Sequence, residues 1–173
     1  MNLKESIRSI PGWPIKGVIF RDLTTLMQDP KAFEQACDIL FDRYKDKNID
    51  KIVGIDARGF VFGAVLAYKL GIGFVPVRKK GKLPHKTLQE SYSLEYGKDT
   101  LEIHEDSIET GEKVVVVDDL IATGGTVGAT VKLVNTLGAD LVECAFIVEL
   151  PDLKGKEKIP GTPVFSIIEF EGE

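Results

Sequence analysis

Short apolar stretches alternate with helix-like segments along the middle of the chain, from Lys51 to Val148. An apolar run of roughly four to eight residues is typical of a buried strand, whereas apolar residues spaced three and four positions apart indicate a helix. Strands that are apolar on both faces and alternate with helices form parallel sheets that are covered on both sides. The order of segments therefore predicts an α/β fold, with a central parallel sheet flanked by helices.

The same spacing gives approximate boundaries for the elements. The predicted strands cover Lys51–Asp56, Phe74–Val77, Lys113–Asp118, Leu141–Val148 and Val164–Ile168. The predicted helices cover Lys31–Lys47, Phe60–Leu70 and Gly124–Leu137, with a short amphipathic helix on Leu3, Ile7 and Ile10. The segment Phe60–Leu70 is apolar on almost every face, so we expect the core or a partner subunit to cover it on all sides.

The segment Gln89–Glu105 interrupts the alternation. Two strand-like runs, Ser91–Tyr96 and Thr100–His104, are joined through Gly97-Lys98-Asp99, which is a sequence typical of a hairpin turn. We expect this hairpin to be an excursion from the core sheet. In its first strand, side-chain alternation places Glu95 on the face opposite the tyrosines.

Composition limits the classes of protein to consider. A chain of 173 residues fits one domain, and its net charge of −5 argues against general binding to nucleic acid or membranes. This net charge does not exclude a local basic site for a small polyanion. No apolar run approaches the roughly 20 residues that span a bilayer, and the first residues lack the apolar centre of a signal peptide. Two distant cysteines, Cys37 and Cys144, indicate reduced core residues, so a cytoplasmic location is expected.

A strand–turn–helix motif carries the strongest functional signal. Four valines precede Asp118 and Asp119, and a glycine turn then leads into a predicted helix. Glycines let backbone N–H groups approach an anion closely, and a helix N-terminus adds unpaired donors and positive partial charge. The residues that we expect to bind a phosphate monoester are Ala122, Thr123, Gly124, Gly125 and Thr126.

The two acids beside this turn would repel a phosphate unless they bind something else. Vicinal ribose hydroxyls are donors, and carboxylates accept hydrogen bonds from them well. The pair Asp118 and Asp119, next to the turn, therefore suits ribose-5-phosphate. The alternative is a strand end that is merely capped by acids and closed by a glycine turn.

The stretch Val114–Thr126 resembles the signature of the type I phosphoribosyltransferase family. Further blocks resemble the adenine-specific members of that family, in the same order: Gly17–Asp22, Asp56–Phe60, Arg78–Pro84 and Ser91–Gly97. The resemblance implies a type I phosphoribosyltransferase-like fold in one domain, 1–173, with an N-terminal base-binding hood over about 1–30 and a flexible hairpin lid over about 80–105. It also implies transfer of a phosphoribosyl group from phosphoribosyl pyrophosphate to adenine, which gives AMP and pyrophosphate.

The resemblance also assigns groups to the pyrophosphate, which must be held and neutralised. These groups are Asp56, Ala57, Arg58, Arg78, Lys79 and Lys82. In the family, the loop at Asp56–Ala57 contains a cis peptide bond, and the arginine that matches Arg78 reaches the neighbouring subunit, which implies a homodimer. We expect Mg²⁺ to arrive with the pyrophosphate, without direct protein ligands. From the residues alone, Arg58 could be an ordinary surface arginine and the basic block a solvated loop.

For the base and the lid, the resemblance assigns Ile19, Phe20 and Arg21 to adenine, with backbone groups of Ile19 and Arg21 reading its edge. Without the resemblance, residues 18–20 would be predicted to form an ordinary core strand. The lid contributes Tyr96 and Glu95, and the resemblance makes Glu95 the catalytic carboxylate over the base. By composition alone, Glu95 would be a routine solvent-facing acid.

Two alternative functions remain at this stage. One is a related enzyme that uses hypoxanthine, guanine or xanthine, which would be expected to carry a side-chain donor for the 6-oxo group; we locate none in the sequence. The other is a regulator that senses phosphoribosyl pyrophosphate and binds nucleic acid. Such a regulator would usually need a binding appendage, and a chain of 173 residues with a net negative charge leaves little room for one.

The two interpretations of Glu95 differ in their effect on turnover. Glutamine keeps the size of the side chain but cannot exchange a proton or carry the negative charge. We expect Glu95→Gln to fold normally and to lower the single-turnover rate by roughly 10²-fold or more, with much smaller changes in substrate dissociation constants. An unchanged single-turnover rate in the folded variant would assign Glu95 to the outer surface of the hairpin.

Overall fold

The computed structural model describes residues 1–94 and 96–172. Its centre is a seven-stranded sheet in the order β5-β6-β4-β3-β7-β8-β9. The parallel strands are β3 (Lys51–Ile55), β4 (Gly73–Lys79), β7 (Lys113–Ile121), β8 (Asp140–Glu149) and β9 (Val164–Glu169). Strands β5 (Thr87–Leu94) and β6 (Gly97–His104) extend one edge as an antiparallel hairpin. The predicted α/β class with a central parallel sheet is confirmed.

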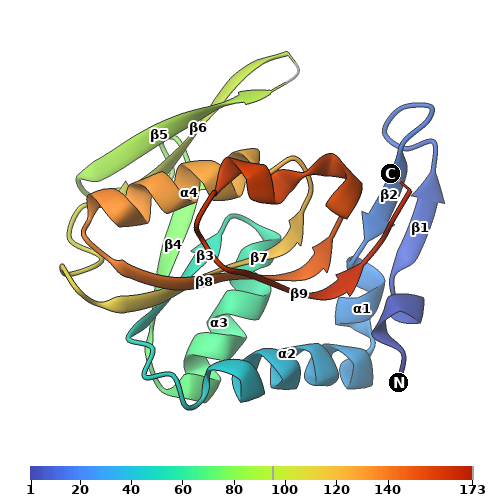
Figure 1. Cartoon of the computed structure of the whole chain (residues 1–173), viewed down its shortest axis with the longest axis horizontal. Coiled ribbons are helices and arrows are strands. Elements are labelled where there is room, and N and C mark those ends of the chain that lie inside the picture. Colours follow the sequence, from blue (N-terminus) through green and yellow to red (C-terminus); the bar gives the residue numbers. More distant parts are fainter. Residues whose placement is uncertain (95, 173) are drawn as a thin grey trace.

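Helices cover both faces of this sheet (Figure 1). Helices α2 (Pro30–Tyr44) and α3 (Arg58–Leu70) lie on one face, and α4 (Gly125–Thr136) lies on the other. Alternation along β7 explains why its run of valines is continuous: Val115 and Val117 pack toward α2 and α3, while Val114 and Val116 pack into the core under α4. Among the described residues, no helix is long and apolar enough to cross a membrane.

The ends of the helices follow local sequence signals. Asp29 caps α2 by accepting hydrogen bonds from the N–H groups of Lys31 and Ala32, and Pro30 occupies the first helical position. Helix α3 ends at Gly71, whose φ of 71° is the left-handed conformation that a side chain disfavours. These signals explain why the predicted helix positions agree with the structure to within a few residues.

The N-terminal region departs from the prediction. A 3-10 helix, η1 (Leu3–Ser6), is followed by strand β1 (Arg8–Pro11), which pairs antiparallel with β2 (Ile19–Asp22). The predicted amphipathic helix through Ile10 was therefore wrong in its second half. The apolar spacing was compatible with a helix, but backbone pairing with β2 decides the conformation. A short helix, α1 (Thr24–Gln28), then leads into α2.

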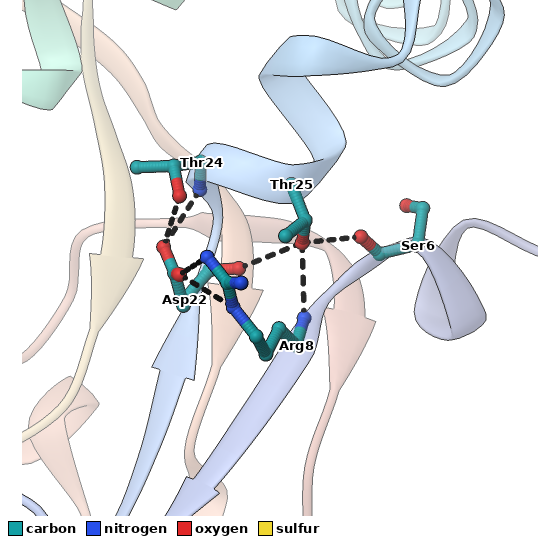
Figure 2. Close-up of polar contacts among 5 residues, drawn as sticks. All are labelled: Ser6, Arg8, Asp22, Thr24 and Thr25. Atoms are coloured by element: carbon teal, nitrogen blue, oxygen red, sulfur yellow. Dashed lines mark hydrogen bonds and ion pairs between the residues drawn. The ribbon is translucent and has the colours of Figure 1, made fainter.

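Asp22 holds the base of this two-stranded hood (Figure 2). Its carboxylate accepts two hydrogen bonds from Arg8, at 2.7 and 3.0 Å, and two more from the hydroxyl and N–H of Thr24. Bonds from Thr24 and Arg8 lower the pKa of Asp22 to about 2. Thr25 completes the junction, since its hydroxyl donates to the carbonyl of Ser6 and accepts from the N–H of Arg8. The hood is thus fixed to the start of α1.

The hairpin β5–β6 is joined to the core sheet at its base. Strand β6 pairs antiparallel with β4 through Arg78↔Glu102 and Lys79↔Leu101, so the hairpin is a continuation of the sheet there and not wholly an excursion from it. Glu102 is buried and accepts hydrogen bonds from the N–H of Gly81 and the hydroxyl of Thr87. These contacts close the loop that leads into the hairpin.

Helix α3 is only partly covered within the chain. Its inner face, which includes Phe62 and Leu66, is buried against the sheet. Val61, Ala64 and Tyr68 form an outer stripe that is exposed, and Tyr68 is 86% exposed. Within the described residues, the core of this chain therefore does not cover the helix on all sides, and the expectation that a partner subunit covers the rest stays a prediction.

A buried polar network joins α2 to β8. The carboxylate of Glu143 accepts hydrogen bonds from Arg43, at 2.6 and 2.9 Å, and from the hydroxyl of Tyr44, at 2.7 Å. Burial raises the pKa of Glu143, but the bonds from Arg43 and Tyr44 outweigh it and hold this pKa below its usual range. A carboxylate with a depressed pKa stabilises the fold above the unfolded pKa, and that stability is lost as pH falls through the folded value.

We therefore predict that Tyr44→Phe lowers the free energy of unfolding by about 1.5–3 kcal/mol at pH 7, the range for hydrogen bonds to charged groups. The loss should shrink as the pH falls from 7 through the depressed pKa of Glu143, where the carboxylate becomes protonated. Urea unfolding over a series of falling pH values measures it. Tyr96→Phe is the matched control, because the same hydroxyl is removed from an exposed ring. Equal effects of the two substitutions would contradict the network.

Candidate active site

The functional blocks meet at the carboxyl ends of β3 and β7. These strands are neighbours in the sheet, with Lys51↔Val114 through Gly54↔Val117 in register. The loop after β3 therefore lies beside the acidic end of β7, and both α3 and α4 begin nearby. Ligands of open parallel sheets bind outside the carboxyl ends of the strands. This edge is where we place the candidate site.

A polar pocket of about 240 Å³ lies between these two strand ends. Its lining consists of Ile55, Asp56, Ala57, Arg58, Asp118, Asp119, Leu120 and Thr126. The structure thus brings together residues from two sequence blocks that were predicted separately. The peptide bond between Asp56 and Ala57 is cis, as the family resemblance implied.

The two acids of β7 have different environments. Asp118 is 8% exposed, and burial together with the neighbouring Asp119 raises its pKa well above the usual range. Its Oδ1 accepts a hydrogen bond from the N–H of Asp119 at 2.8 Å. Asp119 instead pairs with Arg58, whose Nε lies 2.5 Å from Asp119 Oδ2. Burial opposes the charge of Arg58, but Asp119 outweighs it and raises the pKa of the guanidinium.

Strand β7 is longer than predicted. It continues through Asp118 and Asp119 to Ile121, because β8 pairs with it along its whole length, including Leu120↔Val148. Both acids therefore lie within the last part of the strand, whereas the predicted strand ended at Asp118. Strand geometry holds their backbone rigid, and successive side chains point to opposite faces.

The glycine turn after β7 is shaped by close backbone packing. Gly124 has a φ of 86°, and a Cβ atom there would overlap the carbonyl oxygen of Gly155. A Cβ atom on Gly125 would lie 2.9 Å from the ring of Tyr92. No side chain caps α4 within the described part of the chain, so its first N–H groups remain available to an anion.

A second pocket, of about 240 Å³, lies over this turn. Tyr92, Ser93 and Leu94 of the hairpin form one wall. The opposite wall consists of Leu120, Ala122, Thr123, Gly124, Gly125 and Thr126. All five residues that were predicted to bind phosphate therefore line one pocket, and the hairpin covers it as a lid would.

A third pocket, of about 300 Å³, is mainly apolar. Its lining consists of Gly17, Val18, Ile19, Phe20, Arg21, Arg58, Leu120, Ala122, Leu150 and Leu153. The three predicted base-binding residues are among them. Sequence reasoning missed Leu150 and Leu153; their signal was the position of two leucines directly after the apolar strand β8.

The basic block, which begins within the last residues of β4 and continues after it, is divided. The Nε of Arg78 lies 3.2 Å from Asp56 Oδ2, so Arg78 does reach the first pocket's loop. Lys79 instead binds Asp99 and Tyr92 of the hairpin, and Lys82 is exposed. Neither lysine is among the described lining of the three pockets.

The roles of the two lid residues stay predictions. Tyr96 is 89% exposed, and Glu95 lies outside the described residues. For a metal, the described residues contain no group of three or more His, Cys, Asp or Glu side chains placed to hold one. The carboxylates of Asp118 and Asp119 line the polar pocket, and their oxygens suit Mg²⁺ that is bound mainly through the oxygens of a phosphorylated ligand.

Known proteins resemble this chain over its full length. Residues 23–173 match the family model described as the phosphoribosyl transferase domain. An adenine phosphoribosyltransferase of Desulfosudis oleivorans is 64% identical, and the match covers 100% of both chains. The crystal structure of adenine phosphoribosyltransferase from Thermoanaerobacter pseudethanolicus superposes with a TM-score of 0.93 at 49% identity, over 97% of this chain and 98% of that one.

A third comparison includes ligands. Adenine phosphoribosyltransferase of Saccharomyces cerevisiae, complexed with D-2,5-dideoxy-2,5-imino-altritol 1,6-bisphosphate and adenine, superposes with a TM-score of 0.90 at 42% identity, over 95% of this chain and 96% of that one. The similarity thus extends from the sequence to the fold of nearly the whole chain. The chain belongs to the phosphoribosyltransferase family, within its adenine phosphoribosyltransferase branch.

Proposed function

We propose that the chain transfers the 5-phosphoribosyl group from phosphoribosyl pyrophosphate to adenine, giving AMP and pyrophosphate in purine salvage. One observation carries the proposal: Leu120 lines all three pockets, the apolar one, the acidic one and the one over the glycine turn. In a nucleoside 5′-phosphate, the base and the phosphate both extend from a central ribose. Three pockets that meet at one residue, each with the matching chemistry, suit that ligand.

The ribose and its 5-phosphate would take the two polar pockets. Asp118 and Asp119 would accept hydrogen bonds from the ribose hydroxyls, and residues 122–126 would donate backbone N–H groups to the phosphate. Bond breaking at ribose C1 leaves positive charge on the sugar, as in glycoside hydrolysis. Carboxylates fixed beside the sugar can stabilise that charge.

The pyrophosphate must be stabilised as it leaves. Arg58 and the loop at Asp56–Ala57 line the pocket beside the ribose, and Arg78 contacts that loop. We propose that these groups, with Lys79 and Lys82, bind the pyrophosphate oxygens. Mg²⁺, bound through those same oxygens, would neutralise part of their charge.

Adenine would occupy the apolar pocket, between Phe20 and the leucines that follow β8. Backbone groups of Ile19 and Arg21 would read its edge, because adenine offers an exocyclic donor and ring acceptors. A 6-oxopurine would call for a side-chain donor, and the two arginines of the lining bind elsewhere: Arg21 donates to the hydroxyl of Ser9 at 2.6 Å, and Arg58 pairs with Asp119. The pocket therefore favours adenine.

We also propose a homodimer in the cytoplasm. The exposed stripe of α3, with Val61, Ala64 and Tyr68, is apolar enough to be an interface between two copies. It begins one turn after Arg58 and so lies near the pyrophosphate groups. The buried cysteines Cys37 and Cys144 are both free thiols, which suits a reducing compartment.

The function is tested by incubating the protein with Mg²⁺, phosphoribosyl pyrophosphate and one purine at a time. AMP from adenine, with no nucleotide from hypoxanthine, guanine or xanthine, is the expected result. If a nucleotide forms only with a 6-oxopurine, that purine and not adenine is the substrate. No nucleotide from any base would overturn the proposal and favour a binding protein.

We expect Asp118 to increase the catalytic rate and to lower the free energy of unfolding. Its raised pKa means that stability falls as pH rises above the unfolded value of about 3.9, so its charge opposes folding at pH 7. Asp118→Asn keeps an acceptor for the N–H of Asp119 and removes that charge. We expect a higher free energy of unfolding at pH 7, with the gain disappearing near pH 4.

The same variant should lower kcat/KM for phosphoribosyl pyrophosphate by about tenfold or more, since hydrogen bonds to charged groups contribute roughly 1.5–3 kcal/mol. Urea unfolding and initial rates measure the two effects on one preparation. A variant that is less stable at pH 7 but fully active would refute both assignments of Asp118.

The dimer can be tested through Arg78. If Arg78 acts across the interface, Arg78→Ala and Asp119→Ala subunits should complement each other. A heterodimer then contains one site with an intact acid pair and an Arg78 from the other subunit. We expect its activity at low phosphoribosyl pyrophosphate to exceed that of either homodimer. Verified heterodimers without that recovery would confine Arg78 to its own subunit.

A further inference from the structure

Lys79 is held by the hairpin and not by the pyrophosphate pocket. Its Nζ donates to Asp99 Oδ2 at 2.5 Å and to the hydroxyl oxygen of Tyr92 at 2.9 Å. The hydroxyl of Tyr92 also donates to Asp99, at 3.2 Å. The three residues come from β4, β5 and β6, so this cluster ties both strands of the hairpin to the core sheet.

The same cluster contacts the glycine turn. The ring of Tyr92 packs against Gly125, where a Cβ atom would lie 2.9 Å from it, and Tyr92 lines the pocket over the turn. Tyr92 and Asp99 face each other across the hairpin in register. The position of Lys79 is therefore linked to the part of the hairpin that covers the proposed phosphate site.

The contact between Lys79 and Asp99 is suited to exchange. Their side chains are 42% and 35% exposed, and ion pairs that solvent reaches contribute little net free energy. Lysine carries its charge on a flexible stem with rotatable donors, so it can turn from one anion to another. Pyrophosphate carries more negative charge than one carboxylate and would therefore compete with Asp99 for the ammonium group.

The charges of the pair are fully developed in the free protein. Burial opposes the charge of Lys79, but Asp99 and Tyr92 outweigh it and raise the pKa of the ammonium group. The hydrogen bond from Lys79 in turn lowers the pKa of Asp99. Both groups are thus charged at neutral pH. Asp99 and pyrophosphate therefore compete, as two anions, for the ammonium group of Lys79.

We propose that Asp99 is a positioning residue: it holds Lys79 on the hairpin in the free protein, and Lys79 leaves it for pyrophosphate when the ligand binds. This inference rests on the proposed function, which assigns Lys79 to pyrophosphate. Because the two anions compete for one ammonium group, pyrophosphate loosens the attachment of the hairpin, and the attachment weakens pyrophosphate binding by the same factor.

The test is calorimetric titration of Mg²⁺–pyrophosphate into the full-length protein. Asp99→Asn removes the competing charge, so pyrophosphate should bind about two- to fivefold more tightly, the range expected for a partly exposed ion pair. In a Lys79→Met background, Asp99→Asn should have no further effect. Tyr92→Phe keeps the ring on Gly125 and should give a smaller change in the same direction as Asp99→Asn.

A matched control accounts for charge alone. Glu90→Gln removes one negative charge from the same hairpin. The partner of Glu90 is Lys132, whose Nζ lies 3.8 Å from Glu90 Oε1, so the substitution leaves the contacts of Lys79 intact. If Asp99→Asn and Glu90→Gln bind pyrophosphate equally well, or if Asp99→Asn binds it more weakly than the wild type, the role of Asp99 is overturned. In either case the proposed function still holds, provided that the wild-type protein forms AMP. A wild-type protein without pyrophosphate affinity would overturn both.

Discussion

The close approach of helix α3 to strand β7 determines where every part of the site lies. At Gly59, in the first turn of α3, a Cβ atom would lie 2.9 Å from both Asp118 Oδ1 and the carbonyl oxygen of Val117. Only glycine permits this spacing. The approach buries Asp118, brings Arg58 to Asp119 and sets the loop after β3 against the end of β7. The pocket between the strands follows from that one contact.

This geometry carries an unfavourable electrostatic free energy. Two neighbouring acids lie at one strand end, and Arg58 pairs with Asp119. Asp118 is buried beside Asp119, which is why its pKa rises. A sequence selected for stability alone would not place a carboxylate there, so its presence favours a ligand that donates hydrogen bonds. Functional sites commonly depart from the local rules that stabilise the rest of a fold.

Features encoded locally in the chain were predictable. The alternation of apolar strands and helices gave the sheet, and the run from Val114 to Thr126 gave the acids and the glycine turn, because strand, turn and helix start are contiguous. The family resemblance supplied the hood and the loop at Asp56–Ala57. Their grouping into pockets required the register of β3 against β7, which no local pattern contains.

What escaped prediction depends on contacts distant in sequence. Strand β1 exists because β2 pairs with it, although its own spacing suggested a helix. The pairing of Lys79 with Asp99 could not be foreseen, because a basic block looks the same whether its partner is a ligand or a hairpin. Leu153 lines the apolar pocket only because Gly155 packs against the glycine turn and fixes the loop after β8.

The central claim is that three pockets around Leu120 hold the three parts of one nucleotide. A crystal structure of the protein with AMP and Mg²⁺–pyrophosphate tests it most directly. The account predicts the 5′-phosphate on the backbone N–H groups of residues 123–126 and the ribose hydroxyls on Asp118 and Asp119. It also predicts the base between Phe20 and Leu153. A nucleotide bound with its phosphate away from the glycine turn, or its base outside the apolar pocket, would contradict the account.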